Sequence, residues 1–321
     1  MIGAEWIYWV LGAFFFLIGV EIAFDRAHPK RWTNAGFWCL LGVSLCYSSF
    51  VPMLPAWLLG IAVISMALIA GFGLTSSGKV PTTSEFQRAA SSARVGNALF
   101  IPALTIPAVT VLVSVVGGRI VIGGRPLLVQ QSQTLVGLGV ATIVALVVAL
   151  LLLRPKPPTV TLSEGRRLLE SIGWAALLPQ MLATLGLLFT KAGVGTQVGA
   201  IAQHLVPEHS RIFAVIVYAL GMAGFTIVMG NAFAAFPIMT AAIGWPLLVE
   251  HMGAHPAPLF AIAMLSGFCG TLCTPMAANF NLVPPALLEM RDKYAQIKVQ
   301  IPTAVALLGV NIVFMLVFPF R

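Results

Sequence analysis

The stretch QTLVGLGVATIVALVVALLLL (residues 133–153) carries no charged side chain and is long enough to cross a bilayer as one helix. Similar apolar runs recur along the 321 residues, of which 59% are apolar and 9% are charged. An ordinary soluble domain is about 25% charged, so a soluble core could not hide this much apolar surface. A membrane barrel would need short alternating strands instead. The sequence therefore predicts an all-α polytopic membrane protein.

Ten membrane spans can be drawn from the apolar runs. They cover residues 4–24, 35–51, 56–74, 98–117, 133–153, 171–190, 212–229, 231–250, 257–280 and 300–319. A re-entrant hairpin could replace a full crossing at 231–250 and near Gly270. Eight crossings with two hairpins are therefore the alternative to ten crossings.

The basic residues support this drawing and orient it. The loops after the first, third, fifth and ninth spans hold three, three, four and three of the 18 Lys and Arg residues. Because such residues gather on the cytoplasmic side of a membrane, both termini are expected outside the cytoplasm. The same rule explains the net charge of +8, so no nucleic-acid partner is expected.

The stretch RPKPPTVTLSEGRR (154–167) is the natural break in the chain, because its prolines and charges end one bundle of helices. We expect an N-terminal membrane bundle at 1–153, a cytoplasmic linker at 154–170 and a C-terminal bundle with the substrate site at 171–321. Five spans precede the break and five follow it. Two halves with an odd number of crossings have opposite orientations, as inverted repeats in secondary transporters require. No convincing sequence repeat accompanies this symmetry.

The acidic residues and histidines give no sign of an enzyme. None of the ten Asp and Glu residues lies at the centre of a span, and the histidines lie in loops or at span ends. This argues against a carboxylate proton relay and against an intramembrane protease. Glu21, one turn from Asp25, is expected to cap its helix near the cytoplasmic face. No nucleotide-binding or hydrolase motif is present, and no catalytic residue, metal site or cofactor is expected.

The stretch GTLCTPMAANFNLVPP (270–285) holds two threonines, two asparagines and three prolines inside an apolar region. Pro275 removes a helical hydrogen bond, so non-helical backbone is expected from Thr274 onward. Asn279 and Asn281 would share one face of an extended strand and could clamp a substrate there. The alternative is a helix kink whose polar side chains satisfy only its own backbone.

A second polar interruption is MGNAFAAFPIMTAAIGWP (229–246), which we expect to form a broken helix or a re-entrant hairpin. The predicted substrate-binding residues of the two stretches are Asn231, Thr274, Asn279 and Asn281. Pro237 and Pro275 are predicted to break the helices that carry them. A third interruption, at 176–205, contains Pro179 and Gln180 followed by a short amphipathic element.

The stretches FDRAHPKRWTNAGFW (24–38) and GTLCTPMAANFNLVPPALLEM (270–290) resemble a bacterial membrane-protein family that carries a domain-of-unknown-function label. The resemblance extends over the whole chain in length and span pattern. Members are typically encoded beside a second, smaller membrane protein of a sister family, and often near pyroglutamyl peptidase. The pair is regarded as a two-subunit transporter for 5-oxoproline (pyroglutamate). The C-terminal break is also similar in style to the wider ion-transporter superfamily.

The resemblance implies that this chain is the larger subunit of a secondary transporter in the bacterial cytoplasmic (inner) membrane. Its partners would be the smaller membrane subunit, a small carboxylate such as 5-oxoproline, and H⁺ or Na⁺ as the coupling ion. A half-helix N-terminus could hold the carboxylate, and amide side chains could match the lactam. The alternatives are a non-transporting scaffold subunit, a passive channel or, least favoured, an integral-membrane enzyme.

Overall fold

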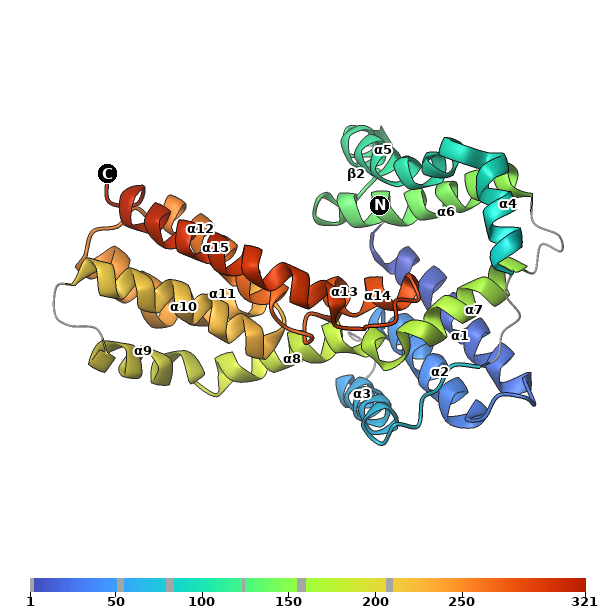
Figure 1. Cartoon of the computed structure of the whole chain (residues 1–321), viewed down its shortest axis with the longest axis horizontal. Helices are drawn as coiled ribbons and strands as arrows, with labels where there is room; N and C mark the ends of the chain where they lie inside the picture. The colour runs from blue at the N-terminus through green and yellow to red at the C-terminus, as the bar shows by residue number, and fades with distance from the viewer. Residues whose placement is uncertain (1–2, 51–54, 79–83, 123–124, 155–159, 206–209) are drawn as a thin grey trace. The chain divides into compact units, whose positions relative to one another are not determined.

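The computed structural model describes residues 3–50, 55–78, 84–122, 125–154, 160–205 and 210–321. Nearly all regular structure in these ranges is helical (Figure 1). The exception is a short antiparallel hairpin, in which β1 (Val121–Ile122) pairs with β2 (Arg125–Pro126). The chain divides into two compact units, Met1–Glu170 and Ser171–Arg321, which are described separately.

The N-terminal unit is built mainly from helical hairpins. In chain order its helices are α1 (Glu5–Phe24), α2 (Arg31–Ser48), α3 (Ala56–Gly71), α4 (Glu85–Val95), η1 (Gly96–Leu99), α5 (Phe100–Gly117), η2 (Gln130–Ser132), α6 (Gln133–Leu153) and α7 (Val160–Ile172). The stretch expected to be a linker, 154–170, therefore contains most of helix α7, and its residues 155–159 lie outside the described ranges. Helix α7 is amphipathic because VTLSEGRRLLESI places its apolar residues at helical spacing.

Small residues allow α1 and α2 to pack at very short range. A Cβ atom at Gly12 would lie 2.7 Å from the Gly42 carbonyl oxygen, and one at Gly42 would lie 2.5 Å from the Gly12 carbonyl oxygen. Toward the other end of the pair, a Cβ atom at Gly19 would meet the Cys39 Sγ atom and lie 3.0 Å from the Ala35 carbonyl oxygen. Such small-residue contacts drive helix association in membranes, where the lipid removes the hydrophobic driving force between helices.

Replacing Gly42 by alanine should lower the free energy of unfolding by about 1–3 kcal/mol. The added Cβ would lie 2.5 Å from the Gly12 oxygen and 2.8 Å from the Phe16 nitrogen, and a backbone cannot yield cheaply. Gly36→Ala is the matched control in the same helix, because nothing lies within 4 Å of its new Cβ. Thermal unfolding of the purified protein compares the two, and equal losses would contradict the close-packing argument.

The C-terminal unit consists of longer helices with several interruptions. Its helices are η3 (Gly173–Leu177), α8 (Leu178–Lys191), α9 (Val194–Leu205), α10 (Arg211–Met229), α11 (Ala232–Met239), the π-helix η4 (Thr240–His251), α12 (Pro256–Leu272), α13 (Ala278–Asn281), α14 (Val283–Leu287) and α15 (Ala295–Val317). Helices α10, α12 and α15 pack against one another (Figure 1). The described part of the unit contains no strand.

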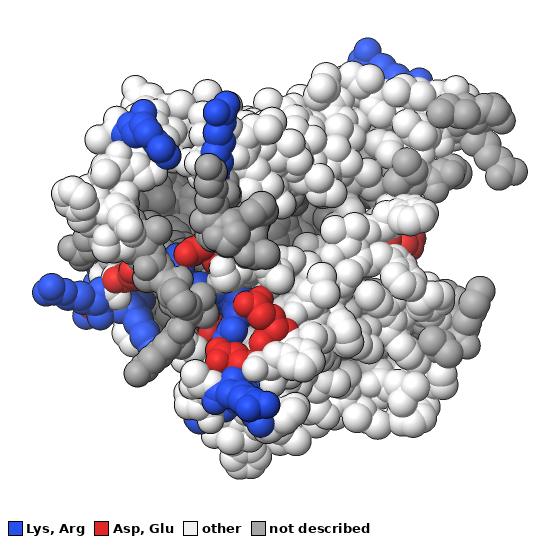
Figure 2. All heavy atoms as spheres, turned by 90° about the vertical axis from the view of Figure 1, so that its right-hand side faces the viewer, with Lys and Arg blue, Asp and Glu red and all other residues white. Residues whose placement is uncertain are grey.

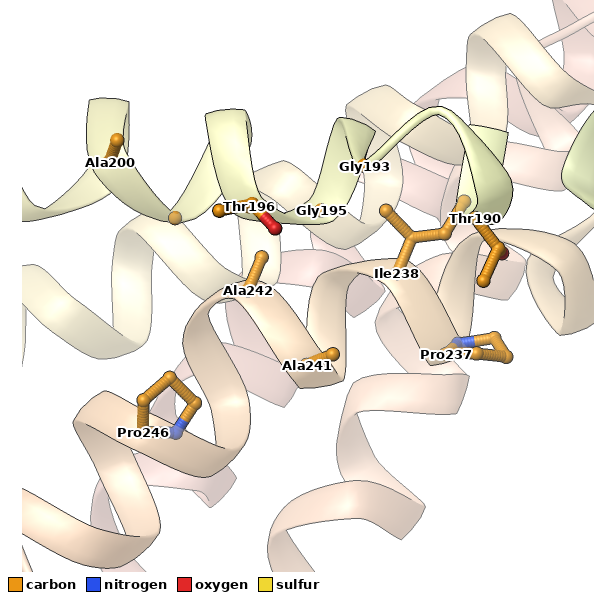
Figure 3. A pocket seen from close by; sticks show the side chains of 11 residues that line it. Thr190, Gly193, Gly195, Thr196, Ala200, Pro237, Ile238, Ala241, Ala242 and Pro246 are labelled. Carbon is orange, nitrogen blue, oxygen red and sulfur yellow. The ribbon is translucent and has the colours of Figure 1, made fainter. Parts of the chain in front are cut away.

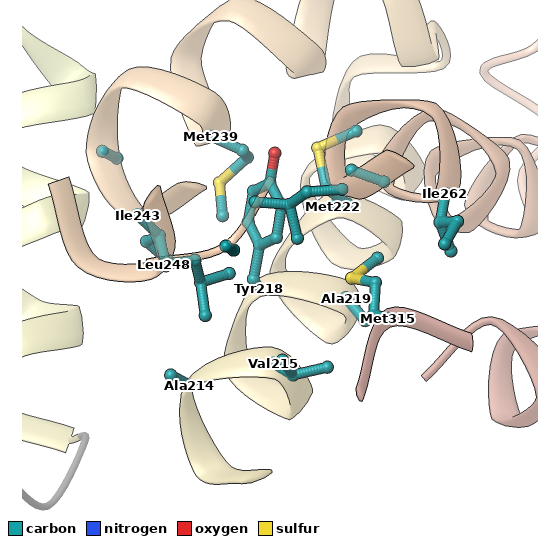
Figure 4. Packing of buried hydrophobic residues seen from close by; sticks show 14 residues of the cluster. Ala214, Val215, Tyr218, Ala219, Met222, Met239, Ile243, Leu248, Ile262 and Met315 are labelled. Atoms are coloured by element: carbon teal, nitrogen blue, oxygen red, sulfur yellow. The ribbon is translucent and has the colours of Figure 1, made fainter. Parts of the chain in front are cut away.

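The core of the C-terminal unit lies around Tyr218 of α10 (Figure 4). Buried methionines surround its ring, including Met222 and Met239. The Tyr218 hydroxyl lies 3.0 Å from the Thr240 hydroxyl at the first residue of the π-helix, and Gly244 leaves room for the ring. Long π-helices are rare and occur often near functional sites, and this one lines the larger of the two cavities described below.

The helices are those of a multi-pass membrane protein. Among the described residues, seven helical segments are long and apolar enough to cross a membrane: α1, Ala89–Gly117, α6, Thr161–Lys191, α10, Ala232–His251 and α15. Two further apolar helices, α3 and α12, lie at the expected spans 56–74 and 257–280 but are shorter than the seven, so the expected count of ten is not established. The remaining expected span, 35–51, coincides over most of its length with α2. The helical membrane class predicted from the sequence is confirmed.

Candidate functional site

The first interruption of the site is the non-helical turn between α10 and α11. Gly230 has φ +67°, a left-handed conformation that ends α10, and Asn231 is extended. The Asn231 Oδ1 atom accepts a hydrogen bond of 2.9 Å from the Phe233 N–H and so caps the N-terminus of α11. From Ala232 the helix runs without a break through α11 into the π-helix and packs back along α10, so Gly230 and Asn231 form the turn between two neighbouring helices. The broken helix or re-entrant hairpin expected within 229–246 is not present.

Pro237 does not break its helix, contrary to the sequence-based prediction. It lies inside α11, and the interruption falls earlier, at Gly230 and Asn231. A proline fixes φ at a value that a helix accepts, and its cost is one missing N–H donor, which membrane helices tolerate. The glycine, which alone adopts the left-handed conformation without strain, decides where the helix stops.

The second interruption follows α12, as Pro275 predicts. Helix α12 ends at Leu272, the backbone is non-helical from Thr274 to Ala277, and the short α13 begins at Ala278. Thr274 lies within this loop, where its hydroxyl donates to the Ile227 carbonyl at 2.8 Å and accepts from the Met276 N–H at 3.2 Å. Thr274 is therefore a buried residue that ties the second interruption to the end of α10.

The two asparagines of the second interruption do not share an extended face, so that prediction is wrong. The Ala277 carbonyl accepts hydrogen bonds from the Phe280 and Asn281 N–H groups, and the backbone resumes a helical turn. Residues two apart on a helix point in different directions. Asn279 is consequently exposed, whereas Asn281 is fully buried.

The two interruptions lie directly against each other. A Cβ atom at Gly230 would lie 2.6 Å from both the carbonyl carbon and the carbonyl oxygen of Met276. Beside this crossing is a cavity of about 240 Å³, which we call the crossing cavity. Its lining residues include Pro179, Leu182, Gly230, Asn231, Phe233, Phe268, Thr271 and Asn279. The structure thus brings Asn231 and Asn279 together at one cavity, while Thr274 and Asn281 hold the backbone beside it.

The crossing cavity offers neutral polar groups and a helix N-terminus. None of its described lining residues carries a charged side chain. The first turn of α11 faces it through Ala232 and Phe233, and the unpaired N–H groups of a first turn carry a partial positive charge. Aromatic rings of Phe233 and Phe268 pack edge to face at 5.7 Å between centroids and supply an apolar wall. This combination suits a small anion with an apolar ring.

A second cavity of about 440 Å³ lies between α8 and α9 on one side and α11 with the π-helix on the other (Figure 3). Thr190 and Thr196 contribute hydroxyl groups to this cavity, and Pro237 and Pro246 line it from the facing helix. Glycines on one face of α9 let this helix approach the π-helix closely. A Cβ atom at Gly199 would lie 2.9 Å from the Ala242 carbonyl oxygen. Pro237 therefore lines a cavity but does not shape a break.

A cluster of charged side chains in the N-terminal unit is absent from the sequence-based site. We call it the Arg166 cluster; it comprises Glu21, Asp25, His28, Arg166 and Glu170. Arg166 lies 2.5 Å from Asp25 Oδ2 and 3.0 Å from Glu170 Oε1. Its Nη1 atom lies 3.7 Å from Glu21 Oε1, and His28 Nε2 lies 3.5 Å from Glu170 Oε1. Figure 2 shows acidic and basic side chains gathered in one region of a mostly uncharged face.

The Arg166 cluster corrects the interpretation of Glu21 as a simple helix cap. Glu21 faces a guanidinium from α7, which lies far away in the sequence. The Glu170 Oε2 atom also accepts a hydrogen bond of 2.6 Å from the Gly78 N–H, so the cluster joins α1, α7 and the loop after α3. One-turn spacing of Glu21 with Asp25 and of Arg166 with Glu170 was the available signal. The described residues contain no cluster of three or more His, Cys, Asp or Glu side chains that could hold a metal ion.

The comparisons with known proteins give one family. The family model described as "Protein of unknown function (DUF979)" matches residues 5–320. No curated protein and no solved structure matches the chain.

Proposed function

The chain belongs to the DUF979 family, and we propose that it works as the larger membrane subunit of a secondary transporter for 5-oxoproline or a similar small carboxylate. The observation that carries the proposal is the contact between two non-helical segments, the α10–α11 turn and the loop after α12, beside a small uncharged cavity. Secondary transporters commonly aim helix N-termini at the anionic group of a substrate and line the site with non-helical backbone, and the N-terminus of α11 and the loop after α12 offer both features here.

In the proposed site the substrate carboxylate lies at the N-terminus of α11. Asn231 fixes the start of that helix, so the free N–H groups of the first turn are pre-oriented toward the cavity. The exposed amide of Asn279 can both donate to and accept from the lactam. The phenylalanine wall then contacts the apolar ring atoms.

The wider arrangement that we propose has ten crossings in two halves of five, with opposite orientation and both termini outside the cytoplasm. The chain would lie in the bacterial cytoplasmic membrane with a second, smaller membrane subunit and would use an ion gradient. No catalytic step is proposed. Uptake of labelled 5-oxoproline by cells expressing both subunits tests the function directly. Uptake no higher than background, with both subunits inserted, would contradict it, and equal uptake by the smaller subunit alone would make this chain a scaffold.

Replacing Asn279 by alanine should raise the KM for 5-oxoproline uptake about 3- to 10-fold, because one neutral hydrogen-bonding group is worth about 0.5–1.5 kcal/mol. The amount of inserted protein should not change, since Asn279 is exposed. Asn97→Ala, at another exposed asparagine in the N-terminal unit, is the control and should leave the KM unaltered. Unchanged kinetics for Asn279→Ala would instead favour a helix kink that binds no substrate.

A further inference from the structure

The Asn281 side chain supplies a hydrogen bond that the backbone cannot make at Pro275. In a continuous helix the residue 275 N–H would donate to the Thr271 carbonyl, but Pro275 has no N–H. The Asn281 Nδ2 group donates to that carbonyl at 2.7 Å and to the Thr274 carbonyl at 2.7 Å. Both of its amide protons are thereby used. This settles the orientation of the amide, because only the nitrogen can donate to two carbonyls.

The other half of the same amide is unpaired. Asn281 is 0% exposed, and its Oδ1 atom has no hydrogen-bond partner among the described residues. A buried amide oxygen without a donor is costly, and native structures rarely leave one. Asn281 is therefore held by its nitrogen in a position that presents a bare oxygen at the interrupted segment.

The surroundings decide which ligand fits this oxygen. An amide does not titrate, and no carboxylate is among the described residues that line the crossing cavity. In the same unit Glu250 binds the Trp245 N–H, and Asp292 pairs with Lys298. Divalent ions prefer sites with carboxylates. Unwound backbone carbonyls and the C-terminal ends of helices coordinate Na⁺ in secondary transporters. A neutral amide oxygen is a ligand of the same kind.

We propose that Asn281 Oδ1, together with backbone carbonyls of the non-helical residues 274–276, binds Na⁺. The inference rests on the proposed function, for which it identifies the coupling ion. The same interruption contributes Met276 and Ala277 to the crossing cavity, so the cation would lie next to the substrate carboxylate. Their attraction makes each bind more tightly in the presence of the other.

The test is the thermal stability of the purified full chain in NaCl and in choline chloride at equal ionic strength, without substrate. A ligand that binds only the folded state raises the unfolding temperature, and we expect a rise of about 3 °C or more in saturating Na⁺. Asn281→Ala should abolish the rise. Asn279→Ala, two residues away on the same helical turn, should keep it. Equal stability of the wild-type protein in both salts would overturn the inference, as would an Asn281→Ala protein that keeps the full rise.

A second variant covers the case in which Asn281→Ala does not fold. Asn281→Asp keeps an oxygen at this position but adds a charge beside the Thr271 and Thr274 carbonyls, so its folding should depend on Na⁺ more steeply than that of the wild type. An Asn281→Asp protein whose stability is indifferent to Na⁺ would overturn the inference. Substrate uptake distinguishes this inference from the proposed function. If 5-oxoproline is taken up but Na⁺ does not change stability, only the proposed ion site is contradicted. If Na⁺ changes stability but 5-oxoproline is not taken up, only the proposed substrate is contradicted.

Discussion

Replacing Gly230 by alanine should lower the free energy of unfolding by about 2–5 kcal/mol and abolish 5-oxoproline uptake. Two independent costs add at this position. Its φ of +67° is unfavourable for any residue with a Cβ atom. The new Cβ would also lie 2.6 Å from the Met276 carbonyl, where backbone meets backbone. The crossing of the two interruptions would have to open, and the cavity beside it would change shape.

Gly224→Ala is the matched control for Gly230→Ala. Gly224 lies in α10, the helix that Gly230 terminates. Nothing lies within 4 Å of its added Cβ atom, and its φ is not positive. Alanine should be tolerated there, because it favours helix more than glycine does. Thermal unfolding and uptake are measured for both variants at equal expression. A Gly230→Ala protein as stable and active as Gly224→Ala would mean that the close approach at Met276 is not required.

Replacing Arg166 by methionine should lower the free energy of unfolding by about 3–5 kcal/mol, because it leaves buried carboxylates without their counter-charge. The Arg166 side chain is 6% exposed and that of Glu170 is 1% exposed, so water cannot solvate the carboxylate in place of the guanidinium. The control is Arg167→Met, whose partner Glu164 is 33% exposed. That half-exposed pair should contribute about 0–1 kcal/mol. Chemical unfolding at neutral pH compares the two variants.

The Arg166 pair with Asp25 should also show itself in the pH dependence of stability. The hydrogen bond from Arg166 holds the pKa of the Asp25 carboxyl below its ordinary value of 3.8. A carboxyl with a lowered pKa in the folded state stabilises the fold above the ordinary pKa, and this contribution is lost as the pH falls through the folded-state pKa. The stability difference between wild type and Arg166→Met should therefore shrink as the pH falls from 5 toward 3. A difference independent of pH would show that Arg166 acts through packing alone.

The double variant Arg166→Met with Glu170→Gln gives a further check. If Glu170 is destabilising only when it loses Arg166, the double variant should be more stable than Arg166→Met alone. Residues in one charged network show such non-additive effects, whereas distant residues do not. A double variant with the summed loss of both single variants would contradict the network.

Much of the architecture could be predicted because it depends on local chemistry. Long uncharged runs such as 133–153 must be helical in a membrane, since only helices satisfy their backbone internally there. The interruption at Pro275 follows from one missing N–H group. Asn231 and Asn279 were also placed among the site residues by sequence, and the structure puts both at the crossing cavity.

What the sequence could not determine depends on which atoms lie opposite each other. A helical turn forms at residues 279–281 because the Ala277 carbonyl accepts the N–H groups of Phe280 and Asn281. Asn279 therefore lines the cavity, whereas Asn281 points inward and donates to the Thr271 carbonyl. Pro237 does not break α11, and the turn at Gly230 packs against the Met276 backbone instead. Arg166 meets Glu21 and Asp25 only after folding. By itself the sequence determined the helices and where one of them must open, because backbone sterics are local; the tertiary structure alone decided which polar groups pair and which remain free for a ligand, because pairing depends on distances between residues far apart in the chain.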